Sequence, residues 1–408
     1  MSNTQKKNVP ELRFPGFEGE WEEKQFADFT KINQGLQIAI NERKTEYSPE
    51  LYFYITNEFL RPNSQTKYFI GNPPQSVIAN KEDILMTRTG NTGKVVTNVF
   101  GAFHNNFFKI KFDKNLYDRL FLVEVLNSSK IQNKILSLAG SSTIPDLNHS
   151  DFYSISSSYP LLREQQKIGK FFSKLDRQIE LEEQKLELLK QQKKGYMQKI
   201  FSQELRFKDE NGNDYPEWES KSIQEIFENK GGTALETEFN FDGNYKVISI
   251  GSYSINSTYN DQNIRVNKNK KTEKYILSKG DLAMVLNDKT KDGKIIGRSI
   301  FIDKDNQYIY NQRTERLIPF AENDNKFLWF LMNTDLIRNK IKGMMQGATQ
   351  VYINYSSIKL ISIQLPLLEE QQKIRGFLEV LSGITTEQLH KIDQLKERKK
   401  AFLQKMFI

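Results

Sequence analysis

The sequence contains no cysteine and only three histidines, His104, His149 and His390. Without cysteine the chain forms no disulfide, carries no thiolate nucleophile and offers no cysteine-bound zinc site. No two of the histidines stand at the spacing of metal ligands, so the sequence holds no pattern for a zinc or iron centre.

Long apolar runs are missing as well. The first residues, 1–14, lack the apolar segment of a secretory signal, and no stretch approaches the ~20 apolar residues that span a bilayer. We therefore expect a cytoplasmic protein with no membrane partner.

Length and charge leave several functions open. The 408 residues suit two or three domains, and 38% hydrophobic residues are ordinary for a globular protein. The formal net charge of +8 would tolerate a polyanion such as nucleic acid. Many basic proteins bind no nucleic acid, so charge alone does not decide between the two.

An internal repeat is the most informative feature. The nine residues of Pro160–Ile168 return almost unchanged as Pro366–Ile374, 206 positions later. A period of about 200 residues is far longer than the 20 to 50 of solenoids and propellers, so each repeat is a whole domain with an appendage.

The start of each repeat is marked too. Glu11–Phe14 recurs as Glu204–Phe207, and Trp21 and Trp218 follow shortly after. Two full units therefore fill the chain. The predicted boundaries are a first domain over residues 1–158, a first long helix over 159–203, a second domain over 204–364 and a second long helix over 365–408.

The end of each unit has the composition of a long helix. Residues 160–201 and 366–407 begin with proline, contain no other proline and are rich in Leu, Gln, Lys and Glu. Their apolar residues follow heptad spacing. Such a helix is roughly 60 Å long at ~1.5 Å per residue, more than a domain of 150 residues covers. A helix packed only on its own domain is the simple alternative, but two matched copies favour pairing with each other.

The globular parts, about 11–158 and 215–364, differ in sequence but share landmarks such as Lys81–Met86 and Lys279–Met284. Each combines strand-like and helical patterns, so we expect a mixed α/β (α+β) domain. The predicted strands are 76–79, 94–97, 107–112, 245–250 and 295–302, and the predicted helices are 117–138 and 325–342.

No catalytic residue can be assigned. Asn72–Gln75 is one residue from the Asn-Pro-Pro-aromatic motif of amino-methyltransferases, but its glutamine cannot stack on a flipped base as an aromatic ring does. Gly90–Lys94 is too short for a phosphate-binding P-loop. We interpret both segments as turns or loops.

Two loops at corresponding places have the composition of a binding site. Thr87–Lys94 and Asn287–Lys294 follow strand-like runs and offer side chains that suit base edges and phosphates. A solvated surface loop explains either segment alone, but a repeated position with different residues favours DNA contact. The candidates here are Arg88, Thr89, Asn91, Thr92, Lys94, Asn287, Lys289, Lys291, Lys294 and Arg298.

Further DNA-binding candidates come from polar corners and from tripeptides that precede strand-like runs in both units. Ordinary turn chemistry is their alternative interpretation. These candidates are Asn105, Ser141, Ser142, Thr143, Gln312, Arg313, Thr349 and Gln350.

The motif Pro-Leu-x-Glu-Gln-Gln-Lys-Ile at Pro160 and Pro366, together with strand entries at Asp83 and Asp281, resembles the specificity subunit of type I restriction-modification enzymes. The resemblance covers essentially the whole chain. It implies two target-recognition domains that each read one half of a bipartite double-stranded DNA target, and no catalytic site. It also implies that the two spacer helices pair as an antiparallel coiled coil with pseudo-two-fold symmetry and set the distance between the half-sites.

The same resemblance implies the partners, which are two methyltransferase subunits and, in the full complex, two motor-nuclease subunits. S-adenosylmethionine, ATP and Mg²⁺ would bind those partners, and this chain would hold no cofactor and no metal. The residues expected on the docking helices are Gln165, Gln166, Ile168, Phe172, Leu175, Gln371, Gln372, Ile374, Leu378 and Leu381.

Two other functions stay open at this point. A tandem-repeat coiled-coil scaffold would join partner proteins without reading DNA, and would lack the steep salt dependence of a DNA reader. A stand-alone nuclease would cut DNA with Mg²⁺ alone, but the sequence offers it no metal site.

Overall fold

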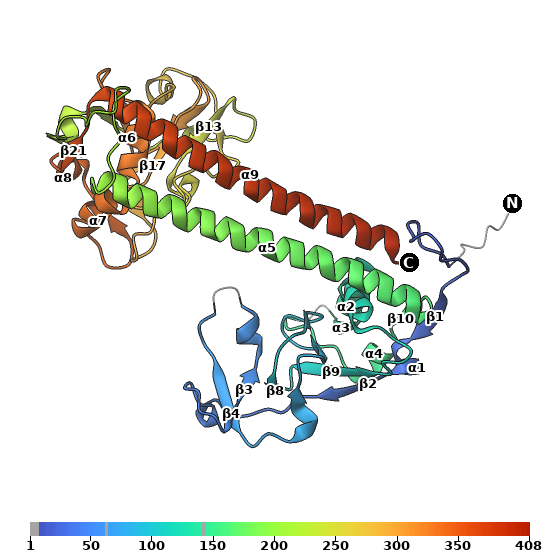
Figure 1. Cartoon of the computed structure of the whole chain (residues 1–408). Helices are drawn as coiled ribbons and strands as arrows, with labels where there is room; N and C mark the ends of the chain where they lie inside the picture. The colour runs from blue at the N-terminus through green and yellow to red at the C-terminus, as the bar shows by residue number, and fades with distance from the viewer. Residues whose placement is uncertain (1–7, 62–63, 141–142) are drawn as a thin grey trace. The chain divides into compact units, whose positions relative to one another are not determined.

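The computed structural model describes residues 8–61, 64–140 and 143–408, and the chain forms two compact units. Unit 1 comprises Met1–Gln184 and Leu389–Ile408, and unit 2 comprises Lys185–Gln388. The two long helices are confirmed as α5 (Leu162–Phe201) and α9 (Leu368–Met406), seen in Figure 1 in green and red. The units divide each helix, whereas the predicted domain boundaries, which stay a prediction, follow the helix ends.

Unit 1 is a mixed α/β domain with two four-stranded sheets, in the orders β2-β9-β6-β7 and β4-β3-β8-β5, and a short β1–β10 pair. Its elements are β1 (Glu22–Gln25), α1 (Phe26–Phe29), β2 (Thr30–Gln34), β3 (Leu51–Ile55), β4 (Tyr68–Gly71), β5 (Ile78–Ala79), β6 (Ile84–Thr87), β7 (Val95–Val96), β8 (Gly101–Phe103), β9 (Phe107–Phe112), α2 (Arg119–Asn127), α3 (Ser129–Ala139), α4 (His149–Tyr153) and β10 (Ser156–Tyr159).

Unit 2 repeats this plan. The order β12-β19-β15-β17 corresponds to the first sheet of unit 1, β14-β13-β18 to the second, and β11–β21 to the short pair, while β16–β20 is an additional pair. Its elements are β11 (Glu219–Ser222), β12 (Phe227–Gly231), β13 (Tyr245–Ile248), β14 (Arg265–Val266), β15 (Leu282–Val285), β16 (Asn287–Asp288), β17 (Ser299–Phe301), β18 (Tyr308–Tyr310), β19 (Thr314–Pro319), α6 (Asn325–Met332), α7 (Asp335–Gly343), β20 (Val351–Tyr352), α8 (Tyr355–Ile358) and β21 (Ser362–Leu365).

Several predicted elements are shorter than expected. The helices predicted over 117–138 and 325–342 each split in two, because Ser128 and Thr334 take extended backbone and their hydroxyls cap the next helix. The strand predicted over 295–302 begins only at Ser299, since Gly297 has a φ of 72° and turns the chain against Ile341. The segment 76–79 opens with a 3₁₀ turn before β5.

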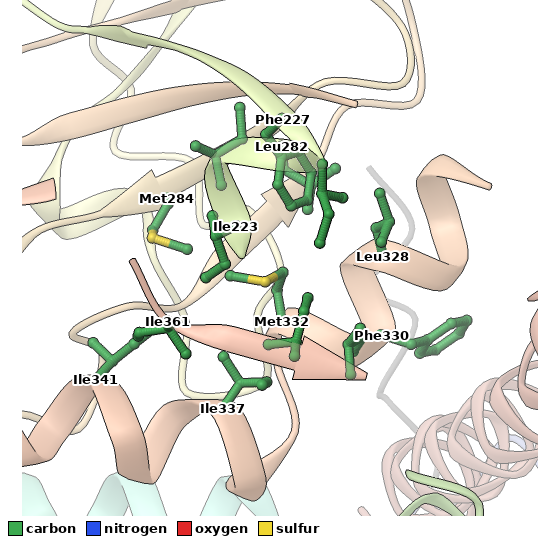
Figure 2. Close-up of a cluster of buried hydrophobic side chains, with 14 of the residues drawn as sticks. Ile223, Phe227, Leu282, Met284, Leu328, Phe330, Met332, Ile337, Ile341 and Ile361 are labelled. Atoms are coloured by element: carbon green, nitrogen blue, oxygen red, sulfur yellow. The ribbon is translucent and has the colours of Figure 1, made fainter. Parts of the chain in front are cut away.

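Each unit buries one end of each long helix. In unit 2, Figure 2 shows apolar side chains from strands and from α6 and α7 pointing toward one another, and Ile200 of α5 and Ile374 of α9 belong to the same core. In unit 1, Phe172 of α5 and Met406 of α9 join Trp21 in the core. The cores of the two units are therefore completed by residues far away in the sequence.

Within unit 1 the helices pair antiparallel. Phe171 meets Phe402 with ring centroids 5.1 Å apart, and about two turns further along α5, Ile179 packs with Leu395, which lies about two turns earlier in α9. Contacts that move forward along one helix move backward along the other. The predicted antiparallel pairing is thus present in this unit.

In each repeat an ion pair to a buried glutamate ties the Glu-Leu-Arg-Phe segment to the head of the long helix that ends that repeat. Arg13 donates through Nε and Nη2 to the two carboxylate oxygens of Glu164, at 2.8 and 2.7 Å. Arg206 makes the same pair of bonds to Glu370, both at 2.9 Å, and Trp218 Nε1 donates to that carboxylate at 3.1 Å. The two repeated motifs of the sequence are therefore the two sides of one contact, called here the head lock.

A second contact of the same motif holds the domain itself. Gln165 Oε1 accepts the backbone N–H of Asp118 at 3.0 Å, and Gln371 Oε1 accepts that of Asp324 at 2.9 Å. Asp118 and Asp324 cap the N-termini of α2 and α6. Each glutamine also donates to the carbonyl of the proline five residues earlier, at 2.8 and 3.0 Å. The direction of α5 is thereby fixed relative to α2, and the direction of α9 is fixed relative to α6.

The head lock predicts a stability difference. Glu370 has no exposed side-chain surface, so the substitution Glu370→Gln leaves Arg206 facing a neutral partner and should lower the free energy of unfolding of unit 2 by about 3 kcal/mol. Glu183→Gln is the matched control, because Glu183 pairs with Lys396 on largely exposed helix faces and should cost less than about 1 kcal/mol. Urea unfolding followed by tryptophan fluorescence measures both, and equal losses would refute the lock.

Candidate nucleic-acid interface

Three segments of unit 1 that carry candidate residues lie side by side. The N–H of Arg88 donates to Asn106 O at 2.7 Å, and Leu147 N donates to Arg88 O at 2.9 Å. An isolated bridge joins Thr89 to Asp146. Residues 88–94, 104–106 and 143–147 therefore form one surface, called here loop cluster 1.

Unit 2 builds the same arrangement with other residues. Leu286 N donates to Arg313 O at 2.9 Å, and Ile353 N donates to Leu286 O at 2.9 Å. The pair β16–β20 sets Asn287 opposite Tyr352. Residues 286–294, 311–313 and 346–353 form loop cluster 2, which corresponds segment by segment to loop cluster 1.

Part of loop cluster 1 is held by its own hydrogen bonds. Arg88 Nη2 donates to Asp146 Oδ2 at 2.6 Å, and the guanidinium lies over the ring of Phe108. Thr89 Oγ1 donates to Asp146 Oδ1. Thr92 is buried, and its hydroxyl donates to Pro145 O at 2.6 Å. Thr92 therefore shapes the loop, while Arg88 is positioned at its edge.

The remaining candidates of loop cluster 1 face solvent. Asn91, Lys94 and Thr143 are exposed, and Ser141 and Ser142 lie outside the described residues. Gly90 and Gly93 have φ values of 87°, which allows the tight loop that presents these side chains. Whether they contact DNA stays a prediction.

Sequence reasoning missed two glutamines beside Asn105. Asn105 Nδ2 donates to Gln37 Oε1 at 3.1 Å, and Gln34 Nε2 donates to Asn105 O at 3.1 Å. The Oδ1 atom of Asn105 is buried and has no hydrogen-bond partner in the described structure. The segment after β2 thus borders loop cluster 1, and no local pattern in the sequence signals that approach.

An acidic residue was missed at the same place in unit 2. Glu236 Oε1 accepts Asn311 Nδ2 at 2.9 Å and Gln312 Nε2 at 2.8 Å. The hydrogen bond from Asn311 is the main cause that holds the pKa of Glu236 below its usual value. Gln312 is therefore oriented by a carboxylate that stays charged at neutral pH.

The lysine-rich loop of unit 2 is organised by Asp288. Its carboxylate accepts Thr290 N at 2.9 Å, Thr290 Oγ1 at 3.0 Å and Ile295 N at 2.9 Å. These bonds close the loop at both ends. Its exposed candidates are Lys289, Lys291 and Lys294, and the exposed candidates on the neighbouring segments are Gln312, Arg313, Thr349 and Gln350.

Arg298 is used by the loop itself. Its Nε donates to Lys294 O at 3.1 Å and its Nη1 donates to Ser257 Oγ at 3.0 Å. Arg338 Nη2 donates to the same carbonyl at 2.8 Å. Burial lowers the pKa of both guanidiniums, that of Arg338 to about 10. Both arginines therefore hold the end of the loop through the carbonyl of Lys294.

The predicted docking residues on the long helices lie mostly on inner faces. Those buried within their own unit are Gln165, Ile168, Phe172, Leu175, Gln371, Ile374 and Leu378. Leu381 is half-buried, and Gln166 and Gln372 are exposed. Contact of any of these residues with a partner stays a prediction.

Neither a metal cluster nor a membrane-spanning helix is present in the described ranges 8–61, 64–140 and 143–408. No group of three or more His, Asp or Glu side chains there is placed to hold a metal ion. No helix there is long and apolar enough to cross a membrane.

Comparison with known proteins agrees with the duplicated fold. The family described as type I restriction modification DNA specificity domain matches residues 18–191 and again residues 215–397. The specificity subunit of the type I restriction enzyme MjaVIII from Methanocaldococcus jannaschii is 26% identical over 410 residues, covering 97% of this chain and 93% of that protein.

Two solved structures share the fold. The S subunit of a type I restriction-modification system from M. genitalium aligns with a TM-score of 0.59 at 16% identity, covering 98% of this chain and 99% of that one. A chain from a study of complex assembly and conformational transition in a type I R-M system aligns with a TM-score of 0.60 at 14% identity, covering 97% and 98%.

The hydrogen bonds of Asp288 predict how well the loop 288–295 is ordered. Asp288→Asn should weaken the bonds to Thr290 and Ile295, so their amide hydrogens should exchange about tenfold faster. Asp292→Asn removes the same charge from the same loop, but Asp292 is exposed and its closest cation, Lys294, is 3.9 Å away. Hydrogen–deuterium exchange should separate the two variants. Equal exchange in both would show that Asp288 does not organise the loop.

Proposed function

Because the chain belongs to the family of type I restriction modification DNA specificity domains, it is a DNA-recognition subunit rather than an enzyme, and we propose how its units divide that task. Unit 1 reads one half of a bipartite double-stranded DNA target through loop cluster 1. Unit 2 reads the other half through loop cluster 2.

The observation that carries this proposal is one frame that presents two different sets of side chains. In both units the same backbone bonds assemble the cluster, around Arg88 in unit 1 and Leu286 in unit 2. The exposed residues differ, with Asn91 and Lys94 in the first and three lysines in the second. A common frame with different donors suits two readers of different base sequences.

The long helices would set the distance between the half-sites. The head lock and the glutamine contact fix each helix to its domain at Glu164 and Gln165 and at Glu370 and Gln371. A helix rises ~1.5 Å per residue, and DNA rises ~3.4 Å per base pair. A rigidly attached helix would therefore convert its own length into a spacer length.

The chain acts with DNA and with the other subunits of a restriction-modification complex. We propose that these are two methyltransferase subunits and, in the full complex, two motor-nuclease subunits. S-adenosylmethionine, ATP and Mg²⁺ would bind those partners. The location would be the cytoplasm, where their DNA lies.

The experiment that tests the function is methylation mapping. Cells that express this chain with a compatible methyltransferase subunit are compared, by single-molecule sequencing of genomic DNA, with cells that lack the chain. We expect a new bipartite, asymmetric motif with adenines methylated on both strands. No new motif from an assembled complex would contradict sequence reading and favour the scaffold.

The proposed role of α5 in setting the spacer length has its own test. Four residues inserted between Leu181 and Leu186 lengthen α5 by about 6 Å, roughly two base pairs, and add close to one full turn. The preferred spacer should change while both half-sites stay the same. Four residues inserted after Gly212, in an exposed turn beyond the helix, form the control and should leave the spacer unchanged. An unchanged spacer in the first variant would show that α5 does not set it.

A further inference from the structure

Unit 2 exposes a phenylalanine beside a run of lysines. None of these residues belongs to loop cluster 2, to which we assign the reading of bases. Phe241 is 90% exposed, in the turn that leads into β13. That turn packs on the chain around β14, because Asn240 pairs with Arg265 and Asn244 N donates to Asn267 Oδ1 at 3.2 Å. The lysine run starts at the next residue. The phenylalanine patch consists of Phe241, Lys268, Lys270, Lys271 and Lys274.

The lysines project from a fixed turn. Asn269 Oδ1 accepts the N–H groups of Lys271 and Thr272 at 2.9 and 3.0 Å, and Asn269 N donates to Thr272 Oγ1 at 2.8 Å. Thr272 is fully buried. Because the backbone is already ordered, binding through these side chains would cost little extra loop entropy.

The lysines of the patch, with Lys230, outnumber the acidic residues beside them, which are Glu238, Asp242 and Glu273. Lys271 Nζ lies 3.3 Å from Glu238 Oε1, which pairs the two. Lys268 and Lys270 are exposed and form no ion pair with a described residue. Lys230 adds another cation, since its Nζ donates to Lys274 O at 3.0 Å. A polyanion is the ligand that such a surface attracts.

The patch adjoins loop cluster 2. Glu236 holds Gln312 of the cluster at 2.8 Å, and the next residue, Thr237, accepts Lys271 Nζ through its hydroxyl at 3.1 Å. A duplex lying on loop cluster 2 would therefore present phosphates close to the lysines.

The described segment 72–77 of unit 1, at the corresponding place, has a different composition and contains no lysine. There the hairpin β3–β4 is followed by Asn72–Gln75 and a 3₁₀ turn, Gln75–Val77. In unit 2 the hairpin β13–β14 is followed by the lysine run and a 3₁₀ turn, Glu273–Tyr275. Among the described residues, two prolines thus occupy the place in unit 1 where unit 2 carries lysines.

We propose that the phenylalanine patch is a second DNA contact, outside the base-reading loops. Lys268 and Lys270 bind phosphates next to the half-site that unit 2 reads, and Phe241 packs against a sugar of the same backbone. This inference rests on the proposed function, and it assigns to unit 2 a larger share of the sequence-independent affinity.

The test measures salt dependence. The double variant Lys268→Gln/Lys270→Gln is assembled with its methyltransferase partners on a duplex that carries the mapped target. Loss of two phosphate contacts should reduce the slope of log affinity against log salt by about 1.8, at ~0.9 per phosphate. Preference for the target over a duplex with one altered half-site should stay unchanged.

The matched control removes two lysines from the β11–α8 part of unit 2. Lys221→Gln/Lys359→Gln changes the net charge equally, and Lys221 Nζ lies 3.7 Å from the exposed Glu219. Its slope should equal that of the unmodified chain. An unchanged slope in the patch variant, or an equal fall in both variants, overturns the proposal. When the unmodified chain still prefers its target, that result leaves the proposed function standing.

Phe241 is tested separately. Phe241→Ala should lower affinity for the target duplex about fivefold at fixed salt, and the slope should not change because no charge is lost. Ile255→Ala, a truncation at another exposed apolar residue of unit 2, should leave affinity unchanged. Equal affinities of the Phe241→Ala variant and the unmodified chain would overturn the role given to Phe241.

Discussion

The buried arginine–glutamate pair at the head of each long helix is the contact on which the rest of the structure depends. A buried carboxylate is costly unless it is paired and hydrogen-bonded, so Glu164 and Glu370 require their arginines. Meeting that requirement ties the first residues of each unit to its helix. The adjacent glutamine then ties the helix to the domain, so each loop cluster has a fixed direction relative to the helix.

The repeat, the two long helices and the mixed α/β fold could be predicted because local sequence patterns indicate them. These patterns are near-identity, heptad spacing and strand-like runs. The breaks at Ser128 and Thr334 could not, since a hydroxyl in a helical stretch becomes a cap only when the following residues bury another face. The pairing of Arg13 with Glu164 could not be predicted either, although both repeated motifs were recognised. A motif does not indicate which residue it will contact 151 positions away.

The segments that form the candidate site could be predicted, but the roles of single residues within them could not. The sequence indicated which segments of each unit correspond, and the structure brings those segments together. It did not indicate that Thr92 and Arg298 serve their own loops, because burial depends on tertiary packing. It also gave no signal for Gln37 or Glu236, which reach the clusters from a loop and a 3₁₀ turn distant in sequence.

The sharing of helix ends has a consequence for synthesis on the ribosome. The ring centroids of Phe407 and Trp21 lie 6.4 Å apart, and Leu12 N donates to Lys405 O, so the core of unit 1 joins segments that precede and follow unit 2 in the sequence. Unit 2 holds one continuous stretch and can close earlier. Unit 1 must wait for α9, and contacts of such long sequence separation form slowly. The nascent chain would thus expose the apolar residues of its first domain until α9 has been synthesised, and this is the interval in which a chaperone would be needed most.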